Sequence, residues 1–364
     1  DEALEKFDEI NERLQKYSLR AIFFSSITNP STRFVNSLVY ATVGVVGAFT
    51  AIAGGISVGQ LSSLLSYANQ YTKGVITELQ NALACAGRVI ELIEEDAEVP
   101  DAEDAVDLEH ANGKVELSHV YFSYVPEQKL IEDFNLSVKP GQRVAIVGPT
   151  GCGKTTLINL LMRFYDVNSG TIKVSDIPLQ QLTRKSLRDN YGMVLQETWL
   201  RSGSIRDNIA MGKPDATDEE MYEALETAQA REFVDAKEGG LSYEIEQGGR
   251  NLSGGQRQRL TIARALVKKP EILIMDDSAS ALDFATDAAL RKAIAHMDGQ
   301  MTVFIVSQRA ASIMQADKIV VLDDGEIVGL GTHEDLLKDC EVYREIYESQ
   351  FKRTEEQQAG EAKR

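Results

Sequence analysis

The chain has 364 residues, 43% of them hydrophobic and 26% charged, and its 38 basic and 56 acidic residues give a formal net charge of −18. This acidic balance argues against a nucleic-acid partner, because contacts to phosphates need a basic surface. The cysteines Cys85, Cys152 and Cys340 are widely separated and have no metal-ligand spacing, which favours reduced thiols in a cytosolic setting over disulfides.

Near the amino terminus, the composition changes to that of a membrane segment, because residues 34–72 contain no Asp, Glu, Lys, Arg or His. A bilayer core of about 30 Å needs roughly 20 helical residues. We therefore predict an all-α transmembrane hairpin within residues 1–93, with spans at about 34–53 and 56–76 joined by a turn at Gly54-Gly55. The alternative is a hairpin buried inside a soluble protein.

The next segment is strongly acidic. Residues 94–109 read EEDAEVPDAEDAVDLE, and Pro100 interrupts any helix there. Such a charge run is typical of a solvated linker. We therefore predict an acidic linker over 94–112, a folded domain over 113–350 and a charged tail over 351–364.

The folded domain contains a phosphate-binding motif. The apolar run at 143–147 predicts a buried strand, and it leads into GPTGCGKT at 148–155, which fits G-x-x-x-x-G-K-[ST]. A helical pattern follows. In such a loop glycines let backbone N–H groups surround phosphates, Lys154 neutralises the outer phosphate oxygens, and the helix amino terminus adds a favourable dipole.

A second motif, LSGGQ at 252–256, narrows the function further. Together with the phosphate loop it resembles the ATP-binding cassette (ABC) family, and the resemblance extends over nearly the whole chain. It implies an α/β P-loop NTPase cassette, with a RecA-like core, an antiparallel β subdomain and a helical subdomain, preceded by the transmembrane hairpin. It also implies ATP and Mg²⁺ as cofactors, and a dimer in which this motif meets the γ-phosphate of a nucleotide held by a second half-transporter.

The family pattern gives individual residues their expected roles. Tyr124 is expected to stack on adenine, Gln196 to touch Mg²⁺ and the attacking water, and residues 280–283 to cross toward the other cassette. Cofactor-binding roles fall on Tyr124, Gly148, Pro149, Thr150, Gly151, Cys152, Gly153, Lys154, Thr155, Thr156, Gln196, Ser253, Gly254, Gly255, Gln256 and Asp276. Metal-binding roles fall on Thr155, Gln196 and Asp276, and catalytic roles on Asp277, Gln308 and Gln196.

Two positions depart from the family pattern. Asp277 stands where hydrolytic cassettes carry a Glu that polarises the attacking water, and Gln308 stands where they carry a His. Asp is one methylene shorter than Glu, and Gln can neither carry positive charge nor transfer a proton as His can. These changes predict a site that binds ATP and hydrolyses it slowly, as in one subunit of heterodimeric exporters.

A heterodimer is therefore favoured over a homodimer with two slow sites. An ATP-gated regulatory or channel-like subunit is the alternative from another class, and a soluble cassette ATPase is disfavoured by the uncharged hairpin. Exporters of this type have six membrane helices per half, so the chain is expected to be the carboxyl-terminal part of a multi-pass protein of a bacterial cell membrane. Its cassette would be cytoplasmic, and nothing in the sequence names the transported substrate.

Overall fold

The structure is a computed structural model that describes residues 2–95, 97–126, 128–277, 281–297, 301–307 and 313–349. The predicted role of Gln308 and the predicted tail at 351–364 lie outside the described residues, as does position 280 of the predicted crossing segment 280–283. The chain divides into two compact units, Asp1–Val99 and Pro100–Arg364, and each is described by itself.

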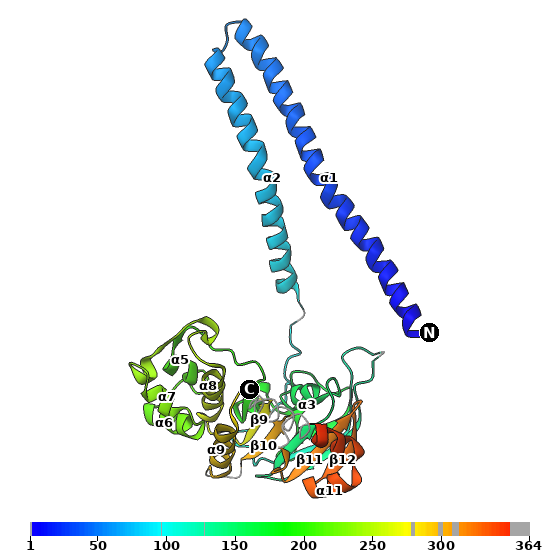
Figure 1. Ribbon diagram of the computed structural model, residues 1–364, viewed down its shortest axis with the longest axis vertical. Helices are drawn as coiled ribbons and strands as arrows, with labels where there is room; N and C mark the ends of the chain where they lie inside the picture. Colours follow the sequence, from blue (N-terminus) through cyan, green and yellow to red (C-terminus); the bar gives the residue numbers. More distant parts are fainter. Residues whose placement is uncertain are drawn as a thin grey trace, which may run out of the picture. The chain divides into compact units, whose positions relative to one another are not determined.

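The first unit is a hairpin of two long helices, α1 (Glu2–Ile52) and α2 (Val58–Glu94), which lie side by side (Figure 1). Gly54 has φ +76°, a left-handed conformation that suits glycine in the turn. Ser57 then starts α2 with a capping box, since its hydroxyl accepts from the Gln60 N–H while the Gln60 side chain accepts from the Ser57 N–H.

The two helices approach each other closely at a glycine. A Cβ built on Gly47 would clash with Cδ1 of Leu61, so a larger residue there would displace the Leu61 side chain. The hydroxyls of Ser37, Thr42 and Thr50 each donate to the backbone carbonyl four residues earlier, which satisfies these polar groups within the helix.

The segment Arg33–Ile52 is long and apolar enough to cross a membrane, with a mean hydropathy of 1.6, and it coincides with the first predicted span. It is the one such segment among the residues that the structure describes. The second predicted span, 56–76, falls on the turn and the first part of α2, and it stays a prediction.

The second unit begins with a four-stranded antiparallel sheet in the order β2-β1-β4-β5. Its strands are β1 (Val115–Phe122), β2 (Ile131–Val138), β4 (Ser169–Val174) and β5 (Ile177–Pro178). The short helix η1 (Leu179–Gln181) and α4 (Arg184–Asp189) follow β5. This sheet is the predicted antiparallel β subdomain.

A six-stranded sheet in the order β12-β11-β3-β10-β9-β6 forms the centre of the unit (Figure 1). Its strands are β3 (Arg143–Val147), β6 (Tyr191–Val194), β9 (Ile272–Asp276), β10 (Thr302–Val306), β11 (Lys318–Asp323) and the antiparallel edge strand β12 (Glu326–Gly331). Val144 and Ile146 pack into one hydrophobic cluster, and Ala145 and Val147 into another. Burial on both faces explains the continuous apolar sequence of β3.

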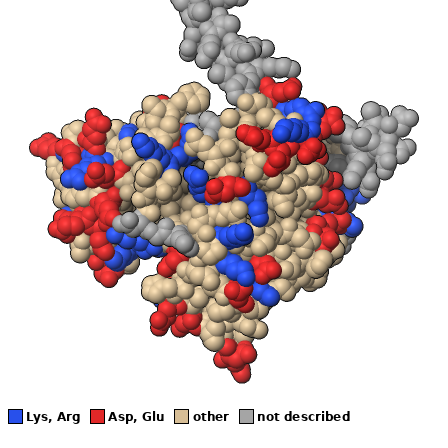
Figure 2. Space-filling model, turned by 90° about the horizontal axis from the view of Figure 1, so that it is seen from below, with Lys and Arg blue, Asp and Glu red and all other residues tan. Residues whose placement is uncertain are grey.

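Short helices complete the unit. The phosphate loop leads into α3 (Lys154–Leu161), and the helical subdomain contains β7 (Gly203–Ser204), α5 (Ile205–Ala210), α6 (Asp218–Thr227), α7 (Arg231–Asp235), η2 (Gly240–Ser242), β8 (Glu244–Ile245), η3 (Gln247–Gly249) and α8 (Gly254–Leu266). The helix α9 (Phe284–Ala295) contacts α6, and α11 (His333–Asp339) contacts β12. Figure 2 shows acidic and basic side chains interspersed over one face of this unit.

The expectation of a solvated linker is wrong for its second half. The Val106 N–H donates to the Gln181 carbonyl at 2.8 Å, and the Thr183 N–H donates to the Val106 carbonyl at 3.0 Å. The Leu108 N–H donates to Oγ of Ser186 at 3.0 Å. The segment thus runs along η1 and α4 as part of the second unit, because its backbone and carboxylates find partners that composition alone does not reveal.

Candidate nucleotide-binding site

The phosphate loop connects β3 to α3, as the sequence predicts. Gly153 has φ +99° at the start of the helix, a conformation that other residues rarely adopt. A Cβ on Gly148 would lie 2.1 Å from the Leu322 carbonyl oxygen, so only glycine fits this close approach of two chain segments. The Lys154 ammonium donates to the carbonyls of Gly148 at 2.9 Å and Pro149 at 2.6 Å, which holds its charge inside the loop.

Parallel pairing brings the predicted site residues to the same edge of the central sheet. Val306 on β10 pairs with Ile146 on β3 and with Asp276 on β9, so the loops that follow these strands lie next to one another. They enclose a pocket of about 330 Å³. Its lining is Thr150, Gly151, Gly153, Lys154, Thr155, Thr156, Gln196, Asp276, Asp277, Val306 and Ser307.

Two adjacent carboxylates, Asp276 and Asp277, lie in this pocket. Asp276 is buried, and burial raises the pKa of its carboxyl; the charge of Asp277 raises it further, while Lys154 opposes the shift. A divalent cation would reverse this balance by favouring the ionised form. No group of three His, Cys, Asp or Glu that could hold a metal occurs among the described residues. The pair of carboxylates in this pocket suits Mg²⁺, which takes one or two protein carboxylates together with phosphates and water.

Asp277 has an unusual backbone. Its φ is +42°, and its N–H donates to the Val306 carbonyl at 2.7 Å, which fixes the turn after β9. Asp tolerates this left-handed region better than longer side chains do. The backbone therefore holds the Asp277 carboxylate beside the phosphate loop, at the point where the family pattern expects Glu.

The LSGGQ motif begins α8 and does not line the pocket. Ser253 caps the helix: its hydroxyl accepts from the Gln256 N–H at 3.2 Å, and its own N–H donates to the Gln256 side chain at 3.0 Å. The side chain of Gln258, completely buried, accepts from the Ala281 N–H at 3.0 Å and so joins α8 to the segment that follows β9. Ser253 is exposed, so the helix amino terminus is available to a group outside this chain's own pocket.

Comparison with known proteins agrees with this geometry. The family described as ABC transporter matches residues 131–280, and the family described as ABC transporter transmembrane region matches residues 1–75. The chain belongs to the ABC transporter family. Its fold is that of an ABC exporter, with a helical transmembrane region followed by a P-loop NTPase domain.

Individual relatives match over nearly the whole chain. The Mycobacterium bovis protein named fatty acid ABC transporter ATP-binding/permease protein is 38% identical over 350 residues, which cover 94% of this chain and 55% of the relative. The β-(1→2)glucan export ATP-binding/permease protein NdvA of Rhodopseudomonas palustris is 36% identical over 348 residues, 94% of this chain and 58% of the relative. The chain thus spans a little over half the length of the curated relatives it matches.

A solved structure gives the same result. A bacterial Atm1-family ABC exporter with ATP bound matches with a TM-score of 0.69 and 29% identity, over 92% of this chain and 59% of the exporter chain. Membership of the family makes this a membrane protein with a cytoplasmic ABC ATPase domain that binds ATP.

Tyr124, predicted to contact adenine, is held against α3. Its hydroxyl donates to Oγ1 of Thr156 at 3.4 Å and accepts from the Asn159 amide at 3.3 Å. Its ring packs edge-on against Phe122 and Tyr165, with centroids 4.9 and 5.0 Å away. The side chain stays about half exposed, at 48%, so a flat base can reach it.

The sequence prediction missed some neighbours of these residues. Asn159 and Tyr165 hold Tyr124 in place, although neither belongs to a recognised motif. Asn159 lies one helical turn after Thr155, so helical spacing could have predicted that it lies on the same face of α3. Ser307 lines the pocket because it directly follows β10, and only the sheet register places it there.

Replacing Tyr124 with Ala is expected to weaken ATP binding by about tenfold, because stacking of a base on an aromatic ring contributes about 1–3 kcal/mol. Tyr124→Phe is the matched control. It keeps the ring and removes only the hydrogen bonds to Thr156 and Asn159. Titration with a fluorescent ATP analogue measures both affinities, and equal affinities for the Ala and wild-type chains would remove Tyr124 from the site.

Proposed function

We propose that this chain is a subunit of an ATP-driven membrane exporter that binds Mg²⁺-ATP in its own pocket, hydrolyses it slowly, and lends its LSGGQ motif to the hydrolytic site of a partner half-transporter. One observation carries the proposal. The phosphate loop, Gln196 and Asp276 converge on one pocket with Asp277 beside them, while the motif at 252–256 is not among the residues that line this pocket.

Each residue then has a defined task. Lys154 and the backbone N–H groups of the loop bind the phosphates, and Tyr124 stacks on the adenine. Thr155, Asp276 and Gln196 hold Mg²⁺. When bound, ATP supplies the phosphoanhydride bond whose hydrolysis drives transport, and Mg²⁺ neutralises its charge.

Slow hydrolysis follows from the two departures from the family pattern. The Asp277 carboxylate is one methylene short of a Glu, so it polarises an attacking water less well when the backbone is fixed. Gln308 can donate a hydrogen bond to phosphate but cannot supply positive charge. Neither change replaces a residue to which ATP binding is assigned.

The partner in this proposal is a second half-transporter that carries the competent site, so a heterodimer is favoured over a homodimer. The protein is multi-pass and lies in a bacterial cell membrane.

An ATP-gated regulatory or channel-like subunit is the competing function, since Asp277 and Gln308 suit a site where ATP acts as a ligand. Phosphate release by the complex purified through a tag on this chain separates the two: steady turnover supports the exporter, and its absence with substrate present favours the gated subunit.

Replacement of Lys154 by Ala is expected to weaken ATP binding to this chain by at least about tenfold, because one positive charge leaves a partly buried phosphate site. Its ammonium donates to the carbonyls of Gly148 and Pro149 and to Sγ of Cys152. Lys154→Arg keeps the charge and is the control for size. Isothermal titration of the purified complex with Mg²⁺-ATP gives both values, and unchanged affinity of the Ala variant would contradict the proposal.

A further inference from the structure

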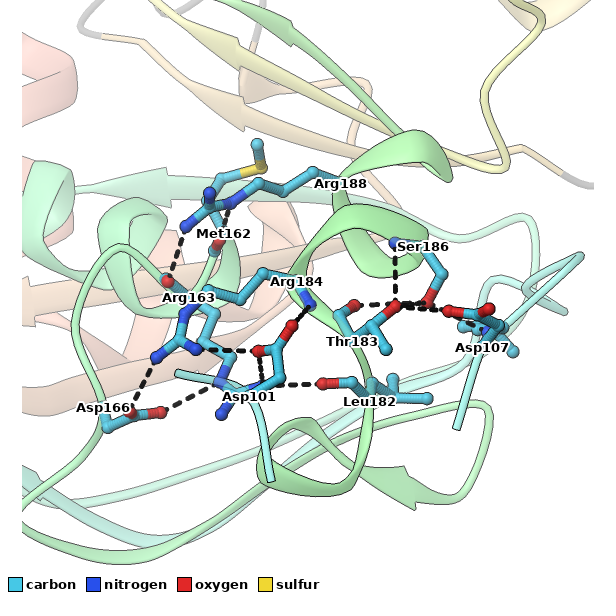
Figure 3. A network of polar contacts seen from close by, with 11 residues as sticks. Asp101, Asp107, Met162, Arg163, Asp166, Leu182, Thr183, Arg184, Ser186 and Arg188 are labelled. Atoms are coloured by element: carbon cyan, nitrogen blue, oxygen red, sulfur yellow. Dashed lines mark hydrogen bonds and ion pairs between the residues drawn. The ribbon is translucent and has the colours of Figure 1, made fainter. Parts of the chain in front are cut away.

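The chain that leaves α2 is attached to the nucleotide-binding unit by a network of charged side chains (Figure 3). Asp101, a few residues after the end of α2 at Glu94, is its centre. One carboxylate oxygen accepts from Nη1 of Arg184 at 2.7 Å and from Nη1 of Arg163 at 3.4 Å. The other oxygen accepts from the Arg184 backbone N–H at 3.0 Å.

Both guanidinium groups are buried. The side chains of Arg163 and Arg184 are 5% and 10% exposed, and Asp166 contacts both of them at 3.0 and 3.3 Å. Burial on its own raises the pKa of Asp101, but the hydrogen bonds from Arg184 and the charges of both arginines outweigh it, so the pKa is lowered. Removing one carboxylate from such a network would leave buried positive charge poorly compensated.

This network also holds the far end of the phosphate-loop helix. Arg163 lies just after α3, has φ +51°, and donates to the Leu182 carbonyl at 2.7 Å. Arg188 donates to the carbonyls of Met162 at 3.2 Å and Arg163 at 3.0 Å, which fixes the chain where α3 ends. The helix starts at Lys154, so about 12 Å of rigid helix separates the phosphate loop from these contacts.

We propose that Asp101 is a positioning residue that couples nucleotide binding at the start of α3 to the segment that connects α2 with the nucleotide-binding domain. A shift of α3 toward bound phosphates moves Arg163. Because Arg163 contacts Asp101, this movement is passed to the segment that connects α2 to the domain. The backbone contacts of Val106 and Leu108 hold the rest of the segment on the domain, so a displacement of Asp101 is passed toward the end of α2. This inference rests on the proposed function, since it needs ATP at the loop and a membrane domain that responds.

The experiment uses the complex purified from membranes, with any cysteines of the partner replaced by serine. Cys85 on α2 is exposed, whereas Cys152 and Cys340 are buried, so an environment-sensitive maleimide dye labels α2 selectively. Titration with Mg²⁺-ATP gives the affinity and the amplitude of the dye response separately. Asp101→Asn is compared with Asp101→Glu, which keeps the charge, and with Asp104→Asn, the same change at an exposed linker position.

We expect Asp101→Asn to lower the melting temperature, because buried positive charge is left poorly compensated. It should still bind ATP within about twofold of wild type, because the phosphate loop keeps its own contacts, and should lose at least about half of the dye response. Asp101→Glu should recover part of the response, and Asp104→Asn should match wild type. A full response from Asp101→Asn overturns the inference, as does a parallel loss of response, ATP affinity and melting temperature, which marks a merely structural role. Wild-type complex that binds ATP without any dye response overturns it too, whereas failure to bind ATP at all overturns the proposed function instead.

Discussion

Replacing Ser253 with Asp is expected to reduce ATP hydrolysis by the purified complex by about 100-fold or more, while ATP binding to this chain's own pocket is retained. Ser253 is exposed at the amino terminus of α8, where the helix dipole and free N–H groups favour an anion. A carboxylate there would neutralise this end of the helix and, if the motif serves the partner site proposed above, repel the γ-phosphate of the ATP in that site. The pocket of this chain does not include Ser253, so its affinity should be spared.

A matched variant isolates the charge. Ser, Asp and Asn are about equally good helix caps, so Ser253→Asp and Ser253→Asn should both preserve the bond to the Gln256 N–H and the stability of α8. The neutral Asn variant should lose less than about tenfold in turnover, because it adds no repulsion. Phosphate release and melting temperature are measured for both. Wild-type hydrolysis by the Asp variant would show that this motif serves no partner site.

Local sequence determines most of the site. The apolar strand β3, the glycine-rich loop and the helix that follows can all be predicted from residues 143–164, because strand burial, loop conformation and helix start are properties of neighbouring residues. The S-x-x-Q spacing of Ser253 and Gln256 likewise predicts the capping box found at α8. The carboxylate at the end of β9 is predicted by the apolar run before it.

Long-range pairing could not be predicted in this way. The contacts of Asp101 with Arg163 and Arg184 join residues 62 and 83 positions apart, and the acidic composition of the linker hides them. A charge run is usually solvated, so the prediction of a free linker follows a sound rule. It fails here because buried arginines supply the counter-charges.

The backbone of Asp277 bears on the predicted slow hydrolysis at this chain's own site. Its φ of +42° and its N–H bond to Val306 fix the start of its side chain, so the reach of the carboxylate depends on side-chain length. Replacing Asp277 with Glu lengthens the side chain by one methylene within the pocket that it lines. Because a misplacement of about 1 Å can cost a hundredfold in rate, we expect Asp277→Glu to raise hydrolysis at this chain's own site by about 10- to 100-fold.

In the proposed heterodimer, that gain is measured after the partner's phosphate-loop lysine is replaced, so that phosphate release reports this site alone. Asp277→Asn is the control, because it keeps the size of Asp without a basic oxygen and should not exceed the wild-type rate. A longer side chain is less well tolerated at positive φ, so the Glu variant should also be slightly less stable. If Asp277→Glu does not raise the hydrolysis rate, either alone or combined with Gln308→His, then the length of this carboxylate does not limit hydrolysis at the site. The slow hydrolysis of ATP bound here would then have another cause.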